Sequence, residues 1–312
     1  MAVVEHRFRV MASEAHLILV DPEPDAVALA MGRLDELEQR WSRFLPDSDI
    51  SRLARANGDS CVVSPATRWL LDAMIAAHRL TAGRFDPTML REIIDAGYDR
   101  SLTDRARRSI TIDLPHPMAT IEDVELDGCT VRLPEGMALD PGGIGKGFAA
   151  DLVSTELVHR GTPGALVSIG GDLSAVGRPP EPEGWRVTIE DPFSPAAELT
   201  TLALNAGGVA TSSTLSRSWQ RGGRRRHHVL DPETGTSSTT DLATVTVFAP
   251  SAWEAEVQAT AAIVQGRDGA LAHLEGRGLS GVAVTSAGQF VATGDLAGAS
   301  PAQAAVAGAV EL

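Results

Sequence analysis

Helical and strand-like patterns are distributed unevenly along this 312-residue chain, and that distribution limits the fold more than any other feature. Apolar residues recur every three or four positions from Val27 to Phe44, which predicts a helix about 27 Å long. Pro65 after Ser64 predicts the start of a second helix, which should end near Leu80. Further along, short strand patterns dominate. Because helices and strands do not alternate as regular βαβ units, the sequence favours an α+β fold over a doubly wound parallel sheet.

Turn residues separate the remaining predicted elements. Gly161 should end one helix, and Ser251 with Glu254 has the spacing of a capping box at the start of another. Residues 92–118 are polar and irregular, so little regular structure is expected there. Helices are predicted at 148–159 and 252–265, and strands at 7–20, 164–169, 185–190, 199–205, 226–230, 243–249, 281–285 and 289–293.

Composition and charge limit the possible partners and compartment. The net charge of -14 argues against a nucleic-acid surface but suits a small-molecule enzyme. Cys61 and Cys129 are too few for a disulfide framework and too far apart in sequence for a metal motif. The first residues carry Glu5, His6 and Arg9 and lack the apolar core of a signal peptide. With no apolar run of about 18 residues, no integral membrane segment is expected. We therefore expect a cytoplasmic protein.

The segment ALDPGGIGKGFAAD, residues 138–151, brings several glycines and a lysine to the start of a predicted helix. Bare backbone amides and a helix N-terminus attract phosphate, and Lys146 adds a positive charge, so a diphosphate is the natural ligand. A Walker A loop is excluded, because Asp140 replaces its first glycine and Gly147 its hydroxyl residue. The dinucleotide fingerprint is excluded as well, because Phe148 replaces its third glycine. A purely structural turn is the alternative.

Two later segments contain further candidate chemistry. Glu256 and Thr260 lie one turn apart on a predicted helix, and their oxygens could form half of a Mg²⁺ site. A solvated glutamate and a packed threonine are the alternative. In HHVLDPETG, residues 227–235, His228 could act as a base or bind a phosphate, or it could be structural. The preceding RGGRRR, residues 221–226, is interpreted as a solvated hairpin tip, with phosphate contact as the alternative.

Glycines at strand ends also occur in SIGGD and GVATSST, and they would let the backbone approach a ligand closely or simply form turns. Taken together, these segments resemble the ApbE-type FAD:protein FMN transferases, also called flavin transferases. Any one motif is only suggestive, but their shared order along most of the chain is specific. The matching segments are Met11-Ala12-Ser13, SRFLPDSDISRL (42–53), GRFDPT (83–88), LDPGGIGKGFAAD (139–151), SIGGD (168–172), VATSS (209–213), HHVLDPETG and the helix with Glu256 and Thr260.

The resemblance implies a fold and a function. It implies one ApbE-like domain over residues 1–312 with mixed or antiparallel sheets, flanking helices and a T-fold-like architecture. The domain would have lobes of about 1–135 and 136–312, and FAD would bind in the cleft between them. The implied activity is Mg²⁺-dependent transfer of the FMN moiety of FAD to a threonine hydroxyl of an acceptor flavoprotein, with release of AMP.

The resemblance also implies site residues. Asp140 and His228 are the candidate catalytic groups, either of which could take the proton of the incoming hydroxyl. Gly143 would bind the metal through its carbonyl, together with Glu256 and Thr260, and Ala259 would add a backbone contact. The FAD site would consist of Met11, Phe44, Arg84, Phe85, Asp86, Asp140, Lys146, Thr211 and His228.

One departure from the family pattern concerns the metal, because Glu256 stands where the family usually has aspartate and is one methylene longer. Other departures lie at Ala12, Ser13, Pro141 and Ser213 and remove no essential group. Two other functions remain compatible with the same residues. One is a Mg²⁺-dependent FAD pyrophosphatase, in which water replaces the acceptor and FMN and AMP are released. The other is a non-catalytic FAD-binding protein.

Overall fold

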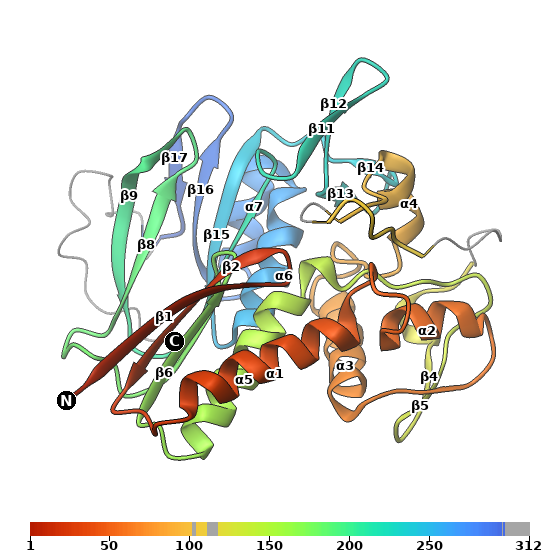
Figure 1. Ribbon diagram of the computed structural model, residues 1–312. Coiled ribbons are helices and arrows are strands. Elements are labelled where there is room, and N and C mark those ends of the chain that lie inside the picture. The colour runs from red at the N-terminus through yellow and green to blue at the C-terminus, as the bar shows by residue number, and fades with distance from the viewer. Residues whose placement is uncertain (102–103, 111–117, 295, 297–312) are drawn as a thin grey trace.

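A large antiparallel sheet forms the centre of the molecule in the computed structural model, which describes residues 1–101, 104–110, 118–294 and 296 (Figure 1). Its 8 strands have the order β1-β2-β6-β7-β10-β15-β16-β17, and every neighbouring pair is antiparallel. The α+β prediction with antiparallel pairing is confirmed. The strands are β1 (Val3–Val10), β2 (Ser13–Val20), β6 (Gly164–Ile169), β7 (Asp172–Gly177), β10 (Gly207–Ser213), β15 (Leu242–Ala249), β16 (Ser280–Thr285) and β17 (Phe290–Ala292).

Helices cover one face of this sheet and a separate hairpin covers the other. On β6, Val167 packs with the helices, whereas Leu166 packs against the hairpin, as strand alternation requires. The hairpin consists of β8 (Trp185–Asp191) and β9 (Ser194–Leu204). The helices are α1 (Ala26–Trp41), α2 (Asp49–Ala56), α3 (Pro65–Leu80), α4 (Leu90–Ala96), α5 (Gly145–His159), α6 (Ala252–Ile263) and α7 (Gly266–Glu275), with short 3₁₀ turns η1 (Ile121–Asp123) and η2 (Pro141–Gly143).

Three small sheets complete the fold. They are β3 (Cys61–Val62) with β5 (Thr130–Arg132) and β4 (Glu125–Asp127), β11 (Ser218–Arg221) with β12 (Arg224–His227), and β13 (Leu230–Asp231) with β14 (Thr236–Ser237). The β11–β12 pair confirms the hairpin predicted around residues 221–226. The strand predicted at 226–230 is wrong as a single element, because β12 ends at His227 and β13 begins at Leu230.

The predicted strand at 7–20 is also wrong as one element, because the chain reverses at Met11 and Ala12 to form the β1–β2 hairpin. Both residues have left-handed backbone angles, φ 51° and 57°, which a two-residue hairpin turn requires. The alternation of apolar residues continues through the turn, and neither residue is a typical turn former. Strands β1 and β2 belong to the first expected lobe, residues 1–135, whereas β6 belongs to the second. Because β2 pairs with β6, the first two strands are part of the same sheet as the strands of the second lobe.

The first residues of α3 and α6 test two predicted helix starts. The Ser64 hydroxyl accepts a hydrogen bond from the Thr67 N–H, so the start of α3 is confirmed. The capping box at Ser251 is wrong, because that side chain makes no cap hydrogen bond. The Asp151 carboxylate on α5 accepts from the first two N–H groups of α6 instead, at 3.0 and 2.9 Å. Helix α6 is thus capped from another helix.

The polar stretch at 92–118 contains the end of α4, whereas residues 104–110 form only an isolated bridge between Arg108 and Arg100. Residues 111–117 of this stretch lie outside the described part of the chain. Among the described helices, none is long and apolar enough to cross a membrane.

Candidate functional site

A cavity of about 440 Å³ opens where the α3–α4 loop, the glycine-rich turn, β10 and α6 meet, a size typical of small-molecule sites. The structure brings together nearly all of the predicted site residues in its lining: Met11, Phe44, Arg84, Phe85, Asp86, Asp140, Gly143, Lys146, Thr211, His228, Glu256 and Thr260. The exception is Ala259, whose side chain is fully buried in the core beneath α6. These residues come from segments far apart in sequence.

The glycine-rich turn brings the start of α5 against α6. Asp140 caps the turn, because its carboxylate accepts from the Gly142 N–H at 3.0 Å, and it also lies 3.4 Å from the Arg43 guanidinium. Gly147 has no room for a side chain, since a Cβ there would lie 2.5 Å from the Ala252 carbonyl oxygen. The two helices therefore approach closely only because residue 147 is glycine.

This close approach places Lys146 between two acidic side chains, Asp172 and Glu256. The ammonium donates to the Asp172 carboxylate and to Glu256 Oε1, the latter at 2.9 Å. Glu256 Oε2 accepts from the Gly147 N–H at 2.8 Å. Both carboxylates are almost fully buried. Asp172 was not predicted, although it ends the SIGGD motif; an acid directly after two glycines was the available signal.

The charges in this cluster shift one another's pKa values. Burial disfavours the Lys146 ammonium, but the charges of Asp172 and Glu256 outweigh it and raise the pKa of Lys146 to about 12. Burial raises the pKa of Glu256 to about 7, although Lys146 opposes this shift. Two carboxylates thus share one ammonium, which leaves an excess negative charge when all three groups are ionised.

The predicted metal ligands lie beside this cluster. Thr260 Oγ1 is 3.1 Å from Ser212 Oγ. A Cβ at Gly143 would lie 3.8 Å from the Thr260 hydroxyl and 3.1 Å from the Phe85 ring, so glycine also lets these elements converge. Thr211, on β10, donates its N–H to Asp172 at 3.4 Å, and its hydroxyl is 2.9 Å from that of Thr246.

These donors fit a hard cation such as Mg²⁺. The available side-chain atoms are oxygens, and the excess negative charge beside Lys146 favours a cation. In the described part of the chain, no group of three or more His, Cys, Asp or Glu residues could hold a metal ion. Glu256 and Thr260 would therefore supply only part of the coordination, and backbone oxygens, water or substrate phosphates would supply the rest, as is usual for Mg²⁺.

His228 enters the cavity from the segment after β12. Burial and the nearby charges of Arg217 and Lys146 lower the pKa of His228 to about 3, so the imidazole is neutral at neutral pH. Its Nδ1 atom is buried and has no hydrogen-bond partner among the described residues. The neighbouring His227 has a structural role, since its Nε2 lies 3.1 Å from the Ser238 carbonyl oxygen. Of the two histidines, only His228 lines the cavity and is available to a ligand.

An aromatic wall faces the glycine-rich turn. The Arg43 guanidinium lies 4.2 Å from the centre of the Phe44 ring and 4.8 Å from that of Tyr98. The Arg43 side chain is buried, and its Nη2 donates a hydrogen bond to the Tyr98 carbonyl at 3.1 Å. Its Nη1 has no hydrogen-bond partner among the described residues. Sequence reasoning missed Arg43 and Tyr98, because neither stands out from its neighbours until the fold brings them together.

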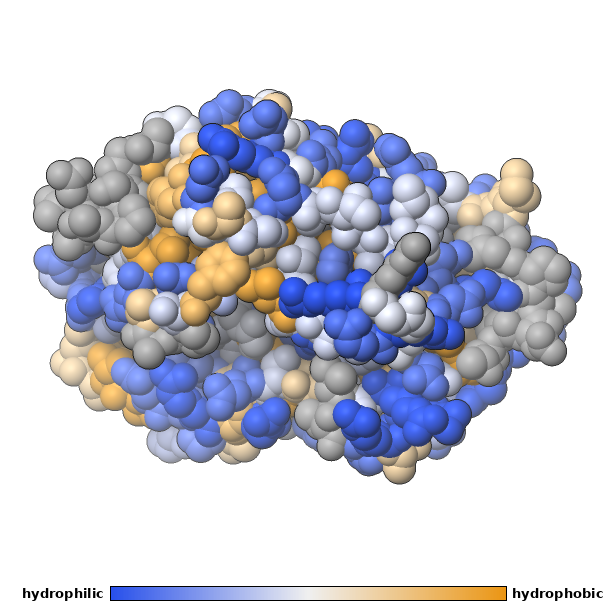
Figure 2. All heavy atoms as spheres, turned by 90° about the horizontal axis from the view of Figure 1, so that it is seen from above, coloured by the Kyte–Doolittle hydropathy of each residue, from blue (hydrophilic) through white to orange (hydrophobic). Residues whose placement is uncertain are grey.

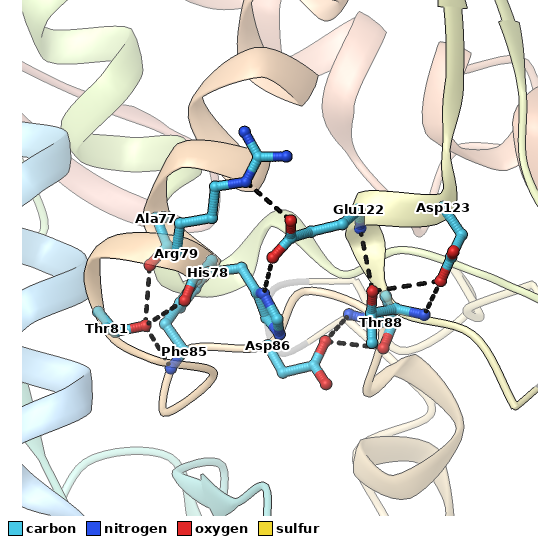
Figure 3. Close-up of polar contacts among 10 residues, drawn as sticks. Ala77, His78, Arg79, Thr81, Phe85, Asp86, Thr88, Glu122 and Asp123 are labelled. Atoms are coloured by element: carbon cyan, nitrogen blue, oxygen red, sulfur yellow. Dashed lines mark hydrogen bonds and ion pairs between the residues drawn. The ribbon is translucent and has the colours of Figure 1, made fainter.

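Side-chain hydrogen bonds shape the GRFDPT loop after α3 (Figure 3). The Thr81 hydroxyl donates to the Ala77 carbonyl at 2.8 Å and accepts from the Phe85 N–H at 3.0 Å. Asp86 Oδ1 accepts from both the N–H and the hydroxyl of Thr88, at 2.9 and 2.7 Å. Arg84 and the buried Phe85 ring thereby line the cavity. Met11 also lines the cavity, and its N–H donates to the Glu38 carboxylate at 2.8 Å.

Comparisons with known proteins identify relatives of this chain by sequence. The sequence model described as "ApbE family" matches residues 11–284. A protein named FAD:protein FMN transferase from Treponema pallidum is 28% identical over 263 residues, which cover 75% of this chain and 69% of that protein. Matches to other proteins of that name, from Klebsiella pneumoniae and Escherichia coli, span only about half of their length.

Solved structures share the fold. The crystal structure of the ApbE protein from Thermotoga maritima superposes with a TM-score of 0.82 at 23% identity, covering 94% of this chain and 97% of that one. The apo form of the flavinyl transferase ApbE from Pseudomonas stutzeri gives a TM-score of 0.77 at 27% identity, and the match covers 94% of each chain.

Proposed function

Since this chain belongs to the ApbE family, we propose that it is an FAD:protein FMN transferase that moves the FMN moiety of FAD to an acceptor protein and releases AMP. The observation that carries the proposal is the contact between Lys146 and Glu256, whose atoms lie 2.9 Å apart although 110 residues separate them in sequence. The glycine-rich turn and the glutamate of α6 thus meet in one cavity.

The lining of the cavity offers groups for both the flavin and the diphosphate of FAD. We place FAD in the cleft between two lobes of an ApbE-like domain, with a ring system against Phe44 and Tyr98. The diphosphate then lies at the glycine-rich turn, near the start of α5 and Lys146. The unpartnered nitrogen atoms of His228 and Arg43 provide hydrogen-bonding groups that such a ligand would satisfy.

The reaction replaces the phosphoanhydride bond of FAD with a phosphate ester bond to the acceptor. The hydroxyl oxygen of an acceptor threonine attacks the phosphorus atom of the FMN moiety, and the bond from that phosphorus to the bridging oxygen breaks. AMP leaves with that oxygen and its electron pair. Lys146 and the neutral His228 orient the phosphates, and Lys146 offsets the charge that develops on their oxygens. Asp140 and His228 are the candidates for accepting the hydroxyl proton.

A divalent cation would complete this arrangement. Glu256 and Thr260 would hold Mg²⁺ together with the backbone of Gly143 and Ala259, and the bound ion would neutralise phosphate charge as a Lewis acid. The longer side chain of Glu256 retains a hard carboxylate ligand, which here also contacts Lys146 and the Gly147 N–H.

Product analysis separates this function from its two alternatives. The protein is incubated with FAD, Mg²⁺ and a threonine-containing acceptor flavoprotein. AMP together with covalently flavinylated acceptor supports the transferase. AMP together with free FMN indicates an FAD pyrophosphatase, and bound FAD without AMP indicates a binding protein.

A further inference from the structure

We propose that the β11–β12 hairpin binds an acidic segment of the acceptor protein and guides the acceptor hydroxyl to the cavity. The inference rests on the proposed function, because that function requires a protein acceptor. It adds the chemistry by which the acceptor is recognised.

The hairpin rises directly from the wall of the cavity. Ser216 and Arg217, which precede β11, line the cavity, and so do His228, Val229 and Leu230, which follow β12. Beyond these two ends, the strands project away from the body of the molecule (Figure 1). A protein that presents a hydroxyl to the cavity from this side would therefore contact the hairpin.

The hairpin is strongly basic in an acidic protein. Residues 217–226 contain arginine at positions 217, 221, 224, 225 and 226 and no acidic residue, whereas the whole chain carries a net charge of -14. Arg221 and Arg225 are exposed. Within the described ranges, Arg217, Arg221, Arg225 and Arg226 form no ion pair with this chain's own acids. Figure 2 looks down on this end of the molecule and shows a largely hydrophilic surface there.

The hairpin is also held in place. Trp219 donates its indole N–H to the Ala96 carbonyl at the end of α4, at 2.7 Å, and its ring lies 5.8 Å from that of Tyr98. Gly97 permits this approach, because a Cβ there would lie 2.9 Å from the indole nitrogen. Tyr98 belongs to the aromatic wall of the cavity. The arginines are thus presented from a base that is anchored to the site itself.

Charge complementarity selects an acidic peptide over a nucleic acid. A long polyanion would contact the acidic remainder of the protein, which would repel it. A short acidic segment can lie on the hairpin alone, and the surrounding negative charge then directs it to this position. The basic hairpin therefore contributes to orientation and encounter.

The test compares two labelled peptides that each contain one threonine, flanked by aspartates in one peptide and by asparagines in the other. Binding is measured by fluorescence anisotropy at low salt. The hairpin variant is Arg221→Gln/Arg225→Gln/Arg226→Gln. The matched control is Arg7→Gln/Arg55→Gln/Arg186→Gln, which removes the same charge at exposed positions on β1, α2 and β8.

We expect the unaltered protein to bind the aspartate peptide about tenfold more tightly than the asparagine peptide, equivalent to about 1.4 kcal/mol. The hairpin variant should lose this preference, and the control variant should keep it. Equal binding of the two peptides by the unaltered protein would overturn the proposal. So would an unchanged preference in the hairpin variant, or complete displacement of the peptide by an equally charged oligothymidine.

A second readout separates this proposal from the function on which it rests. With FAD, Mg²⁺ and a saturating concentration of acceptor flavoprotein, the hairpin variant should release AMP at the unaltered protein's maximal rate, because the three replaced arginines lie outside the phosphate site. If the unaltered protein fails to produce AMP with or without an acceptor, the proposed function is wrong, whatever the peptide preference. If AMP is produced but the peptide preference is absent, only the docking proposal is wrong.

Discussion

At the scale of single residues, the positive charge of Lys146 stabilises two buried carboxylates, those of Asp172 and Glu256. Replacing this lysine with methionine would leave Asp172 and Glu256 without their shared cation, and breaking a buried ion pair in this way is strongly destabilising. We expect Lys146→Met to lower the free energy of unfolding by about 3 kcal/mol at pH 8.

The loss in Lys146→Met should be smaller at pH 5. Without the ammonium, the pKa of Glu256 rises above its present value of about 7, so the carboxyl is protonated in the folded variant at pH 5. Urea denaturation at the two pH values measures the difference. An equal loss at both pH values would show that the buried acids do not determine the effect.

His228 provides a second residue-scale prediction. Its pKa is lowered to about 3 from an ordinary value of 6.5, so the folded protein disfavours the charged imidazole. The stability that it contributes is complete above pH 6.5 and is lost as the pH falls towards 3, by up to about 1.4 kcal/mol per pH unit. His228→Gln should therefore show a flatter decline of unfolding free energy between pH 6.5 and 4. An unchanged slope would contradict the burial of a neutral His228.

At the scale of elements, the crossing of α5 and α6 depends on Gly147. A methyl group there would meet the Ala252 backbone at 2.5 Å, so Gly147→Ala should separate the helices and move Lys146 away from Glu256. We expect a loss of about 2 kcal/mol in stability, as for other overpacked sites, and a weaker affinity for FAD. Thermal denaturation and a flavin fluorescence titration measure the two effects.

Gly32→Ala is the matched control for this substitution. Gly32 lies in α1 with open space around its Cα, and alanine favours helices, so this change should raise stability by up to about 1 kcal/mol. Similar effects of the two glycine substitutions would contradict the close crossing.

Local patterns predicted α1, α3, α5, α6 and several strands, but they missed α2, α4 and α7. Two further errors arose where a distant segment determines the structure. The apolar pattern that begins at Val27 predicted α1, and Pro65 after Ser64 predicted the start of α3. Both signals come from residues that are close in sequence. The cap of α6 comes from Asp151, about a hundred residues away, so inspection around Ser251 could not find it. The turn at Met11 and Ala12 is stabilised by the pairing of β1 with β2 and has no turn residue to reveal it.

At the scale of the whole molecule, the resemblance of short motifs to a known family predicted the candidate site residues. The fold then brings these distant segments together in one cavity. The glycine-rich turn and the α6 acid were each ambiguous in sequence, and their contact across the α5–α6 crossing is what joins them. Asp172, Arg43 and Tyr98 could not be selected beforehand, because their roles depend on partners that are remote in sequence.

The most direct test of the account is AMP release by Glu256→Gln, with Glu254→Gln, a half-buried acid on the same helix, as the control. Removing the charge while keeping the side chain's shape should lower the rate of AMP release from FAD, Mg²⁺ and the acceptor flavoprotein by about 100-fold or more. FAD binding, measured by fluorescence titration, should remain close to normal, and Glu254→Gln should retain both properties. Full AMP release by a folded Glu256→Gln protein would contradict the claim that Lys146 and Glu256 form one phosphoryl-transfer site.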